Sequence, residues 1–137
     1  MLFVLDTNTV AYFLKGMGGV GENLLSRPRS AIAVPSVVLY EIEYGVQRSP
    51  LGDRRRRQLE QFLGTLEVLP FGTAEAHSAA SIRIALESEG RSIGPHDVMI
   101  AATALANAAT LVTHNVRELS RVPGLQLVDW YEPSRHP

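Results

Sequence analysis

Short apolar runs alternate with longer segments of helical character along the chain, and this alternation restricts the fold more than any other feature. Strands that alternate with helices usually pair in parallel, with the helices packed on both faces of the sheet. We therefore expect an α/β protein, a single α/β/α sandwich with a mostly parallel central sheet. The apolar runs predict strands at 2–5, 31–34, 66–69, 111–113 and 125–128. The segments between them predict helices at 8–15, 36–47, 52–64, 73–89 and 95–109.

Residues that commonly end strands or begin helices mark the boundaries of these elements. Pro35 is expected to stop the second strand, and Ser36 to cap the helix that follows. Asp53 is expected to cap the third helix, and Pro95 suits the first position of the last one. That last helix is apolar on nearly every side, which predicts that it is buried.

Composition limits the size and surroundings of the protein but not its function. With 137 residues, 45% of them hydrophobic, the chain can form one domain over 1–137 with a real core. The absence of cysteine excludes disulfides, thiolate zinc sites and cysteine nucleophiles. The lack of cysteine also suits a reducing compartment, so we expect a cytoplasmic protein. No apolar run approaches the roughly 20 residues of a membrane-spanning helix, so we expect no membrane partner. The net charge of −1 does not by itself indicate a nucleic-acid partner.

Three carboxylates are placed where a parallel sheet binds its ligands. Asp6 ends the first strand, and ligands of such sheets bind at the carboxyl ends of the strands. Asp97 lies in the first turn of the buried helix, and Glu41 lies at the border of an apolar helix face. Each acid also has a structural explanation. Asp6 could cap a helix, the helix dipole favours an acid at Asp97, and Arg48 could pair with Glu41.

Acids gathered in this way predict a metal site. Like charges repel and would not all stay ionised without a cation, and all-oxygen ligation selects Mg²⁺ or Mn²⁺ over zinc. Such an ion supports hydrolysis of phosphodiester bonds. Asn115 follows another strand and could offer its carbonyl oxygen or orient a metal-bound water, although it could equally cap a short helix.

Four sequence blocks resemble PIN-domain ribonucleases, and more closely the VapC-type toxins, over nearly the full length of the chain. No single block is decisive, but the four occur in order at the expected separations. They are LDTN at 5–8, SVVLYEIEYG at 36–45, GPHDVMIAATAL at 94–105 and LVTHNVREL at 111–119.

The family's acidic residues match Asp6, Glu41 and Asp97 one by one. Asn115 stands where many PIN proteins carry a fourth acid, and His96 stands where the family often has Asn. The resemblance implies that small hydroxyl side chains line the site, and the matching positions are Thr7, Ser36 and Thr113.

The resemblance also implies an activity and partners. PIN-domain toxins are Mg²⁺- or Mn²⁺-dependent endoribonucleases that cut RNA, often tRNA or rRNA, and arrest translation. They usually form homodimers and are held inactive by a small cognate antitoxin protein. None of this follows from composition or periodicity.

Three other functions compete with this interpretation. An aspartyl-phosphate phosphatase would use Asp6 as a nucleophile, but such enzymes carry a second Asp two residues on, where this chain has Asn8. A PIN nuclease that is not a toxin and a non-catalytic binding module also remain open. Gly16, Gly18 and Gly21 form the G-x-G-x-x-G pattern of dinucleotide-binding loops, but in such loops the glycines lie directly between a strand and a helix. Here helical residues separate the glycines from the strand, so we expect a flexible loop between helices.

Several other side chains have no assigned role. The run Arg54–Arg57 could contact phosphates or an antitoxin, or could be a solvated helix end. His96 and His114 could contact substrate, although exposed loop positions are favoured for both. His77 and His136 carry no signal. Trp130, the single tryptophan, is expected to cover the edge of the sheet or the core.

Overall fold

Five parallel strands form the central sheet in the order β3-β2-β1-β4-β5. The structure is a computed structural model, and it describes residues 1–132. Residues 133–137, with His136, lie outside that range. All five predicted strands are confirmed, as is their parallel pairing. The strands are β1 (Phe3–Leu5), β2 (Ile32–Pro35), β3 (Glu67–Leu69), β4 (Thr110–Val112) and β5 (Gln126–Val128).

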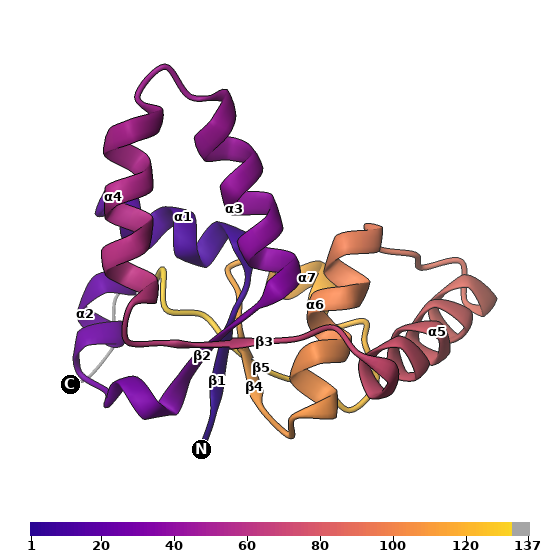
Figure 1. Ribbon diagram of the computed structural model, residues 1–137. Helices are drawn as coiled ribbons and strands as arrows, with labels where there is room; N and C mark the ends of the chain where they lie inside the picture. Colours follow the sequence, from indigo (N-terminus) through magenta and orange to yellow (C-terminus); the bar gives the residue numbers. More distant parts are fainter. Residues whose placement is uncertain (133–137) are drawn as a thin grey trace.

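Helices cover both faces of the sheet, which confirms the α/β/α sandwich. Helices α1 to α4 lie on one side of the sheet and α5 to α7 on the other (Figure 1). Because β1 is the middle strand, the segment that follows it lies at the centre of the sheet's carboxyl edge. The helices are α1 (Thr7–Lys15), α2 (Val20–Leu25), α3 (Ser36–Arg48), α4 (Gly52–Leu63), α5 (Thr73–Ser88), α6 (Pro95–Ala106) and α7 (Val116–Leu119).

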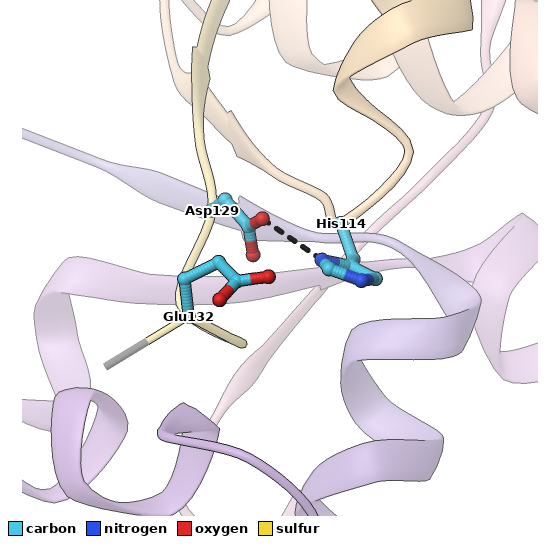
Figure 2. A group of neighbouring side chains, drawn as sticks. All are labelled: His114, Asp129 and Glu132. Atoms are coloured by element: carbon cyan, nitrogen blue, oxygen red, sulfur yellow. Dashed lines mark hydrogen bonds and ion pairs between the residues drawn. The ribbon is translucent and has the colours of Figure 1, made fainter. Parts of the chain in front are cut away.

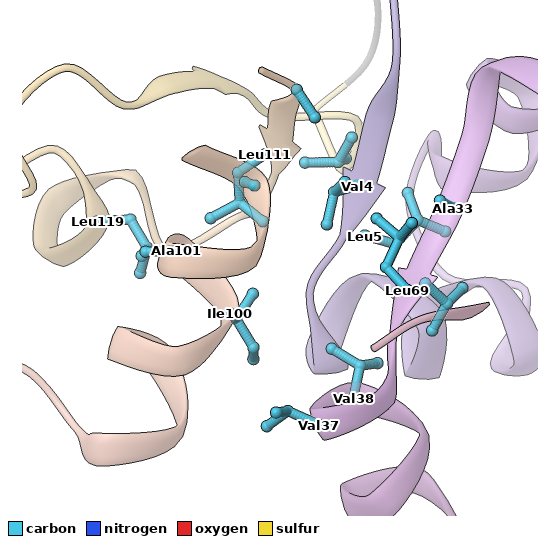
Figure 3. Packing of buried hydrophobic residues seen from close by; sticks show 14 of the residues in the cluster. Val4, Leu5, Ala33, Val37, Val38, Leu69, Ile100, Ala101, Leu111 and Leu119 are labelled. Atoms are coloured by element: carbon cyan, nitrogen blue, oxygen red, sulfur yellow. The ribbon is translucent and has the colours of Figure 1, made fainter. Parts of the chain in front are cut away.

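The core extends over both faces of the sheet, with Val10 of α1 and Leu24 of α2 on one side and α6 on the other. Ile100 and Ala101 of α6 belong to the same buried cluster as Val4 and Leu111 of the central strands (Figure 3). The prediction of a buried last helix is confirmed, since half of the residues of α6 are buried. Trp130 is also buried, and its ring packs 5.1 Å from that of Phe3, as expected for a side chain that closes the core.

The loop expected between helices at the glycines is present but short: it spans 16–19, and Gly21 already belongs to α2. Gly16 ends α1 in the left-handed conformation, but Val20 starts a six-residue helix that buries two apolar side chains. So short a helix shows no clear periodicity. Its start is held by residues distant in sequence: Gly19 N donates to Tyr131 O, and a Cβ at Gly18 would come within 3 Å of Tyr131.

Several predicted boundaries are also wrong by one or more residues. Pro35 is the last residue of β2 and takes the cap position of α3, so Ser36 is the first helical residue and not the cap. Proline is tolerated at a strand end because a missing N–H costs least there. Helix α4 begins at Gly52, which places Asp53 in its first turn. Helix α6 ends three residues early, and Ala108 adopts a positive φ of 51° soon after it.

No helix within residues 1–132 is both long and apolar enough to cross a membrane.

Candidate active site

Asp6 lies at the centre of the carboxyl edge, directly after β1, and is buried. Its Oδ1 accepts a 2.9 Å hydrogen bond from Thr9 N, so it caps α1 as the structural alternative expected. Burial raises the pKa of the Asp6 carboxyl, and the charge of Glu41 raises it further, while hydrogen bonds from Thr113 and Thr9 partly offset the rise. Capping of α1 by Asp6 therefore does not exclude metal binding by the same carboxylate, because the capping hydrogen bond uses only Oδ1.

Glu41 reaches the same edge from the middle of α3. Its Oε1 accepts a 2.6 Å hydrogen bond from the Thr7 hydroxyl, and its Oε2 lies 3.1 Å from Nδ1 of His96. Arg48, the partner considered from sequence, instead lies against Tyr44, to whose hydroxyl it donates a hydrogen bond. The carboxylate of Glu41 is thus held by a hydroxyl and an imidazole and has no guanidinium partner among these contacts.

Asp97 lies in the first turn of α6 and is half-buried. Burial is the largest cause of its raised pKa, and the negative charges of Asp6, Glu41 and Glu118 raise it further. Neighbouring negative charges raise the pKa of a carboxyl group only when they lie within electrostatic reach of it. The structure therefore brings the three predicted acids together.

Glu118 is a fourth acid that sequence reasoning missed. It lies on α7, three residues after Asn115, whose amide Nδ2 donates a 3.2 Å hydrogen bond to Glu118 Oε2. Asn115 occupies the cap position of α7, but its side chain makes no capping hydrogen bond there. The sequence contained one signal for Glu118. It follows Asn115 by three residues, and this spacing places two side chains on the same face of a helix.

The three predicted hydroxyl residues lie at this edge in different environments. Thr7 contacts Glu41 as described, and Thr113 is fully buried directly after β4. The Thr113 oxygen accepts from Asn115 N at 3.0 Å, and the Thr113 hydroxyl also hydrogen-bonds to the Asp6 carboxylate. Thr113 therefore joins the loop of Asn115 to Asp6. Ser36 is half-buried at the first position of α3, beside the end of β2.

The residues present fit a divalent cation of the Mg²⁺ class. The donors are all carboxylate oxygens, which Mg²⁺ and Mn²⁺ prefer. Burial and, after it, repulsion from the neighbouring acids raise the pKa of Asp97, and a cation would offset that repulsion. The chemistry of this donor set is that of metal-assisted hydrolysis of phosphate esters.

A different group of potential ligands lies nearby. His114 follows β4, Asp129 follows β5, and Glu132 comes three residues later, with one ligand atom from each within 4.8 Å of the others (Figure 2). His114 is an exposed loop residue, as the sequence pattern favoured, whereas that pattern gave no role to Asp129 or Glu132. Asp129 directly follows β5, just as Asp6 directly follows β1, and this shared position at a strand end could have identified Asp129 from the sequence.

The side chains of the arginine run and His96 have different contacts. Arg56 forms an ion pair with Glu43, and Arg55 donates to Gln58, whereas Arg54 and Arg57 are exposed. The arginine run therefore does not form one continuous face. His96 proves to be a helical residue in contact with Glu41 and not a loop residue.

Comparison with known proteins identifies relatives over nearly the full chain. Residues 3–125 match the PIN domain family. "Ribonuclease VapC2" of Rickettsia felis is 37% identical over 132 residues, which cover 95% of this chain and 98% of that protein. "tRNA(fMet)-specific endonuclease VapC" of Salmonella typhimurium is 34% identical over 128 residues, covering 93% and 97% of the two chains.

Solved structures give the same relationship. A chain of VapBC2 from Rickettsia felis, bound to a DNA fragment from its promoter, superposes with a TM-score of 0.87 at 36% identity, covering 95% of this chain and 99% of that one. A chain of DNA-bound VapBC from Salmonella typhimurium superposes with a TM-score of 0.89, also at 36% identity and with the same coverage.

Proposed function

The chain belongs to the PIN-domain family and to its VapC ribonucleases, and on this premise we propose that it is an RNA-cleaving hydrolase, a metal-dependent endoribonuclease that acts as the toxin of a toxin–antitoxin pair. The observation that carries the proposal is the meeting of Asp6, Glu41 and Asp97 at one sheet edge, with the pKa values of both aspartates raised.

Asp6, Glu41 and Asp97 would hold the divalent ion, Mg²⁺ or Mn²⁺, with Glu118 beside them. When bound, such an ion would supply Lewis-acid assistance to the attacking water and would stabilise negative charge on the departing oxygen. Thr7 holds the Glu41 carboxylate in one orientation through its hydrogen bond. Asn115 acts in an auxiliary way, by holding the Glu118 carboxylate through its amide.

The substrate in this proposal is an RNA, and we propose a tRNA. The support is the relative from Salmonella typhimurium, a tRNA(fMet)-specific endonuclease that is 34% identical over nearly the full length of both chains. Incubation with initiator tRNA, elongator tRNA and rRNA fragments in parallel would identify the class. Cleavage of all three at the same rate would contradict a tRNA substrate.

The partner in this proposal is a small antitoxin. Structural relatives of this chain are described as VapBC assemblies. The acidic cluster of Asp6, Glu41 and Asp97 is a natural target for an inserted Arg or Lys, whose charge would replace that of the metal. A homodimer is the oligomeric state that the family resemblance implies, and light scattering of the purified protein checks it.

Expression of the wild-type chain and of Asp6→Ala, each alone, tests the toxin function. We expect the wild type to arrest growth and degrade RNA, and Asp6→Ala to do neither. Co-expression of the gene upstream of this one should relieve the arrest. If both variants arrest growth equally, or neither does, the toxin function is wrong.

Two further outcomes separate the alternatives. Divalent-dependent RNA cleavage in vitro without growth arrest would indicate a PIN nuclease of another role. An aspartyl-phosphate enzyme would instead form a covalent adduct at Asp6 with a phosphate analogue such as beryllium fluoride. The exposed Asn8, in place of the second Asp of such enzymes, argues against that outcome.

A further inference from the structure

His114, Asp129 and Glu132 form a compact group at the carboxyl ends of β4 and β5. One ligand atom from each lies within 4.8 Å of the other two, and the side chains converge on a common point (Figure 2). The group includes an imidazole, which distinguishes it from a simple acidic surface. It uses none of the residues assigned above to the hydrolytic site.

The imidazole and one carboxylate are already oriented. Nδ1 of His114 lies 2.8 Å from Oδ2 of Asp129, while the other Asp129 oxygen accepts a 2.8 Å hydrogen bond from Tyr131 N. The His114 ring also packs against an aromatic pair, with centroids 4.4 Å away at Tyr131 and 6.1 Å away at Tyr12. Such preorganisation lowers the entropic cost of binding an ion.

We propose that these three side chains form a second metal site, specific for a transition-metal ion of the Zn²⁺ class. One imidazole nitrogen and two carboxylates suit Zn²⁺, Co²⁺ and Ni²⁺, whereas Mg²⁺ prefers oxygen ligands alone. An ion would replace the proton shared by His114 and Asp129, and water would complete its coordination. The carboxylate site of Asp6, Glu41 and Asp97, called the oxygen-only site below, would thus prefer Mg²⁺ or Mn²⁺. The site with His114 would prefer an ion of the Zn²⁺ class, because one of its donors is nitrogen.

Occupation of this site would connect three segments that are distant in sequence. The ion would join the loop after β4 to the segment 129–132 that follows β5. That segment already holds the start of α2, because Gly19 N donates to Tyr131 O at 2.9 Å. Asn115 is the next residue after His114, so the ion would also restrict the loop that carries Asn115.

Trp130 provides a local reporter for the experiment. It is the only tryptophan of the chain, and it lies between Asp129 and Tyr131 in the sequence. Paramagnetic Co²⁺ bound by the adjacent side chains should quench its fluorescence. We would titrate the untagged full-length chain with Co²⁺ while saturating Mg²⁺ occupies the oxygen-only site, and follow both Trp130 fluorescence and Co²⁺ absorption in the visible range.

The expected result is saturable quenching with one Co²⁺ per chain, and competition by Zn²⁺. His114→Gln and Glu132→Gln should each weaken Co²⁺ binding at least about tenfold, because changes even outside the ligand set commonly cost that much. His96→Gln is the matched control, since His96 is also exposed and also paired with a carboxylate. Asp97→Asn should likewise bind Co²⁺ as the wild type does.

Three outcomes would overturn the proposal. These are the absence of saturable quenching, equal affinity of the wild type and His114→Gln, and loss of binding in Asp97→Asn with retention in His114→Gln. The last would place Co²⁺ among the hydrolytic carboxylates. Thermal unfolding of each variant verifies that it folds. Because the measurement is metal binding and not RNA cleavage, its outcome is independent of the proposed ribonuclease function.

Discussion

Thr7 donates a 2.6 Å hydrogen bond to Glu41, which joins the first residue of α1 to the middle of α3 across 34 residues of sequence. This contact holds one oxygen of the Glu41 carboxylate and leaves the other beside His96. A carboxylate fixed in this way pays less conformational entropy when it binds an ion.

Replacing Thr7 with Val removes this hydrogen bond and nearly preserves the side-chain volume. Hydrogen bonds to charged groups contribute about 1.5–3 kcal/mol, so we expect divalent-dependent RNA cleavage to fall about tenfold or more. Thr7→Ser keeps the hydroxyl and should retain most of the activity. If Thr7→Val and Thr7→Ser are equally active, the hydrogen bond does not position Glu41.

Replacing Asp97 with Asn should abolish cleavage without unfolding the protein. The change is nearly isosteric, but it removes one of the proposed metal ligands and its charge. We expect a loss on the order of 100-fold or more in RNA cleavage, since a catalytic metal contributes several kcal/mol. Asp53→Asn, at an exposed position of α4, is the matched control and should cleave normally. Cleavage by Asp97→Asn at the wild-type rate would remove Asp97 from the site.

Replacing Asp6 with Asn should stabilise the metal-free protein at neutral pH. Burial raises the pKa of Asp6, so the folded state binds this proton more tightly than the unfolded state. Stability is therefore lost as the pH rises from the ordinary value of 3.8 through the raised pKa. Asn keeps an oxygen that can accept from Thr9 N and carries no charge.

Thermal unfolding in a chelator measures this effect. The melting temperature of Asp6→Asn should exceed that of the wild type at pH 7, and the difference should shrink below the ordinary pKa. Added Mg²⁺ should raise the melting temperature of the wild type more than that of the variant. A variant that melts below the wild type at pH 7 would show that the charge of Asp6 is already compensated.

Asn115 should contribute less to catalysis than Asp6. A neutral amide adds little attraction for a cation, and the Asn115 amide donates to Glu118, through which it would act on the site. We expect Asn115→Ala to retain measurable cleavage under conditions where Asp6→Ala has none. Glu118→Gln should raise the Mg²⁺ concentration needed for half-maximal cleavage, because it removes a nearby negative charge. Equal losses in Asn115→Ala and Asp6→Ala would make Asn115 essential.

Arg54 and Arg57 should account for any contact of the arginine run with RNA phosphates. They are exposed and three residues apart on α4, whereas Glu43 offsets the charge of Arg56. Neutralising both should reduce the slope of log affinity against log salt by about 1.4, the value expected for two phosphate contacts to single-stranded RNA. Arg56→Gln is the control and should leave the slope nearly unchanged. An unchanged slope in the double variant would make the run a solvated helix end.

Much of the fold was predictable from the sequence because it depends on local patterns. The apolar runs around Val4 and Leu111 and the alternation of strands and helices are properties of neighbouring residues. They predicted the parallel sheet and, through the ligand rule for its carboxyl edge, the region of Asp6. The position of Glu41 on α3 followed in the same way from helical periodicity.

Other features depended on contacts between distant segments, which no local pattern contains. Helix α2 is held by Tyr131, more than 100 residues away, and the partners of Glu41 come from α1 and α6. The place of Glu118 beside Asp97 and the meeting of His114 with Asp129 were likewise decided by how α7 and β5 pack. The sequence by itself determined which residues stand at strand ends and on helix faces. Tertiary packing decided which of those side chains share a site, because charge repulsion, hydrogen bonding and burial act across space and not along the chain.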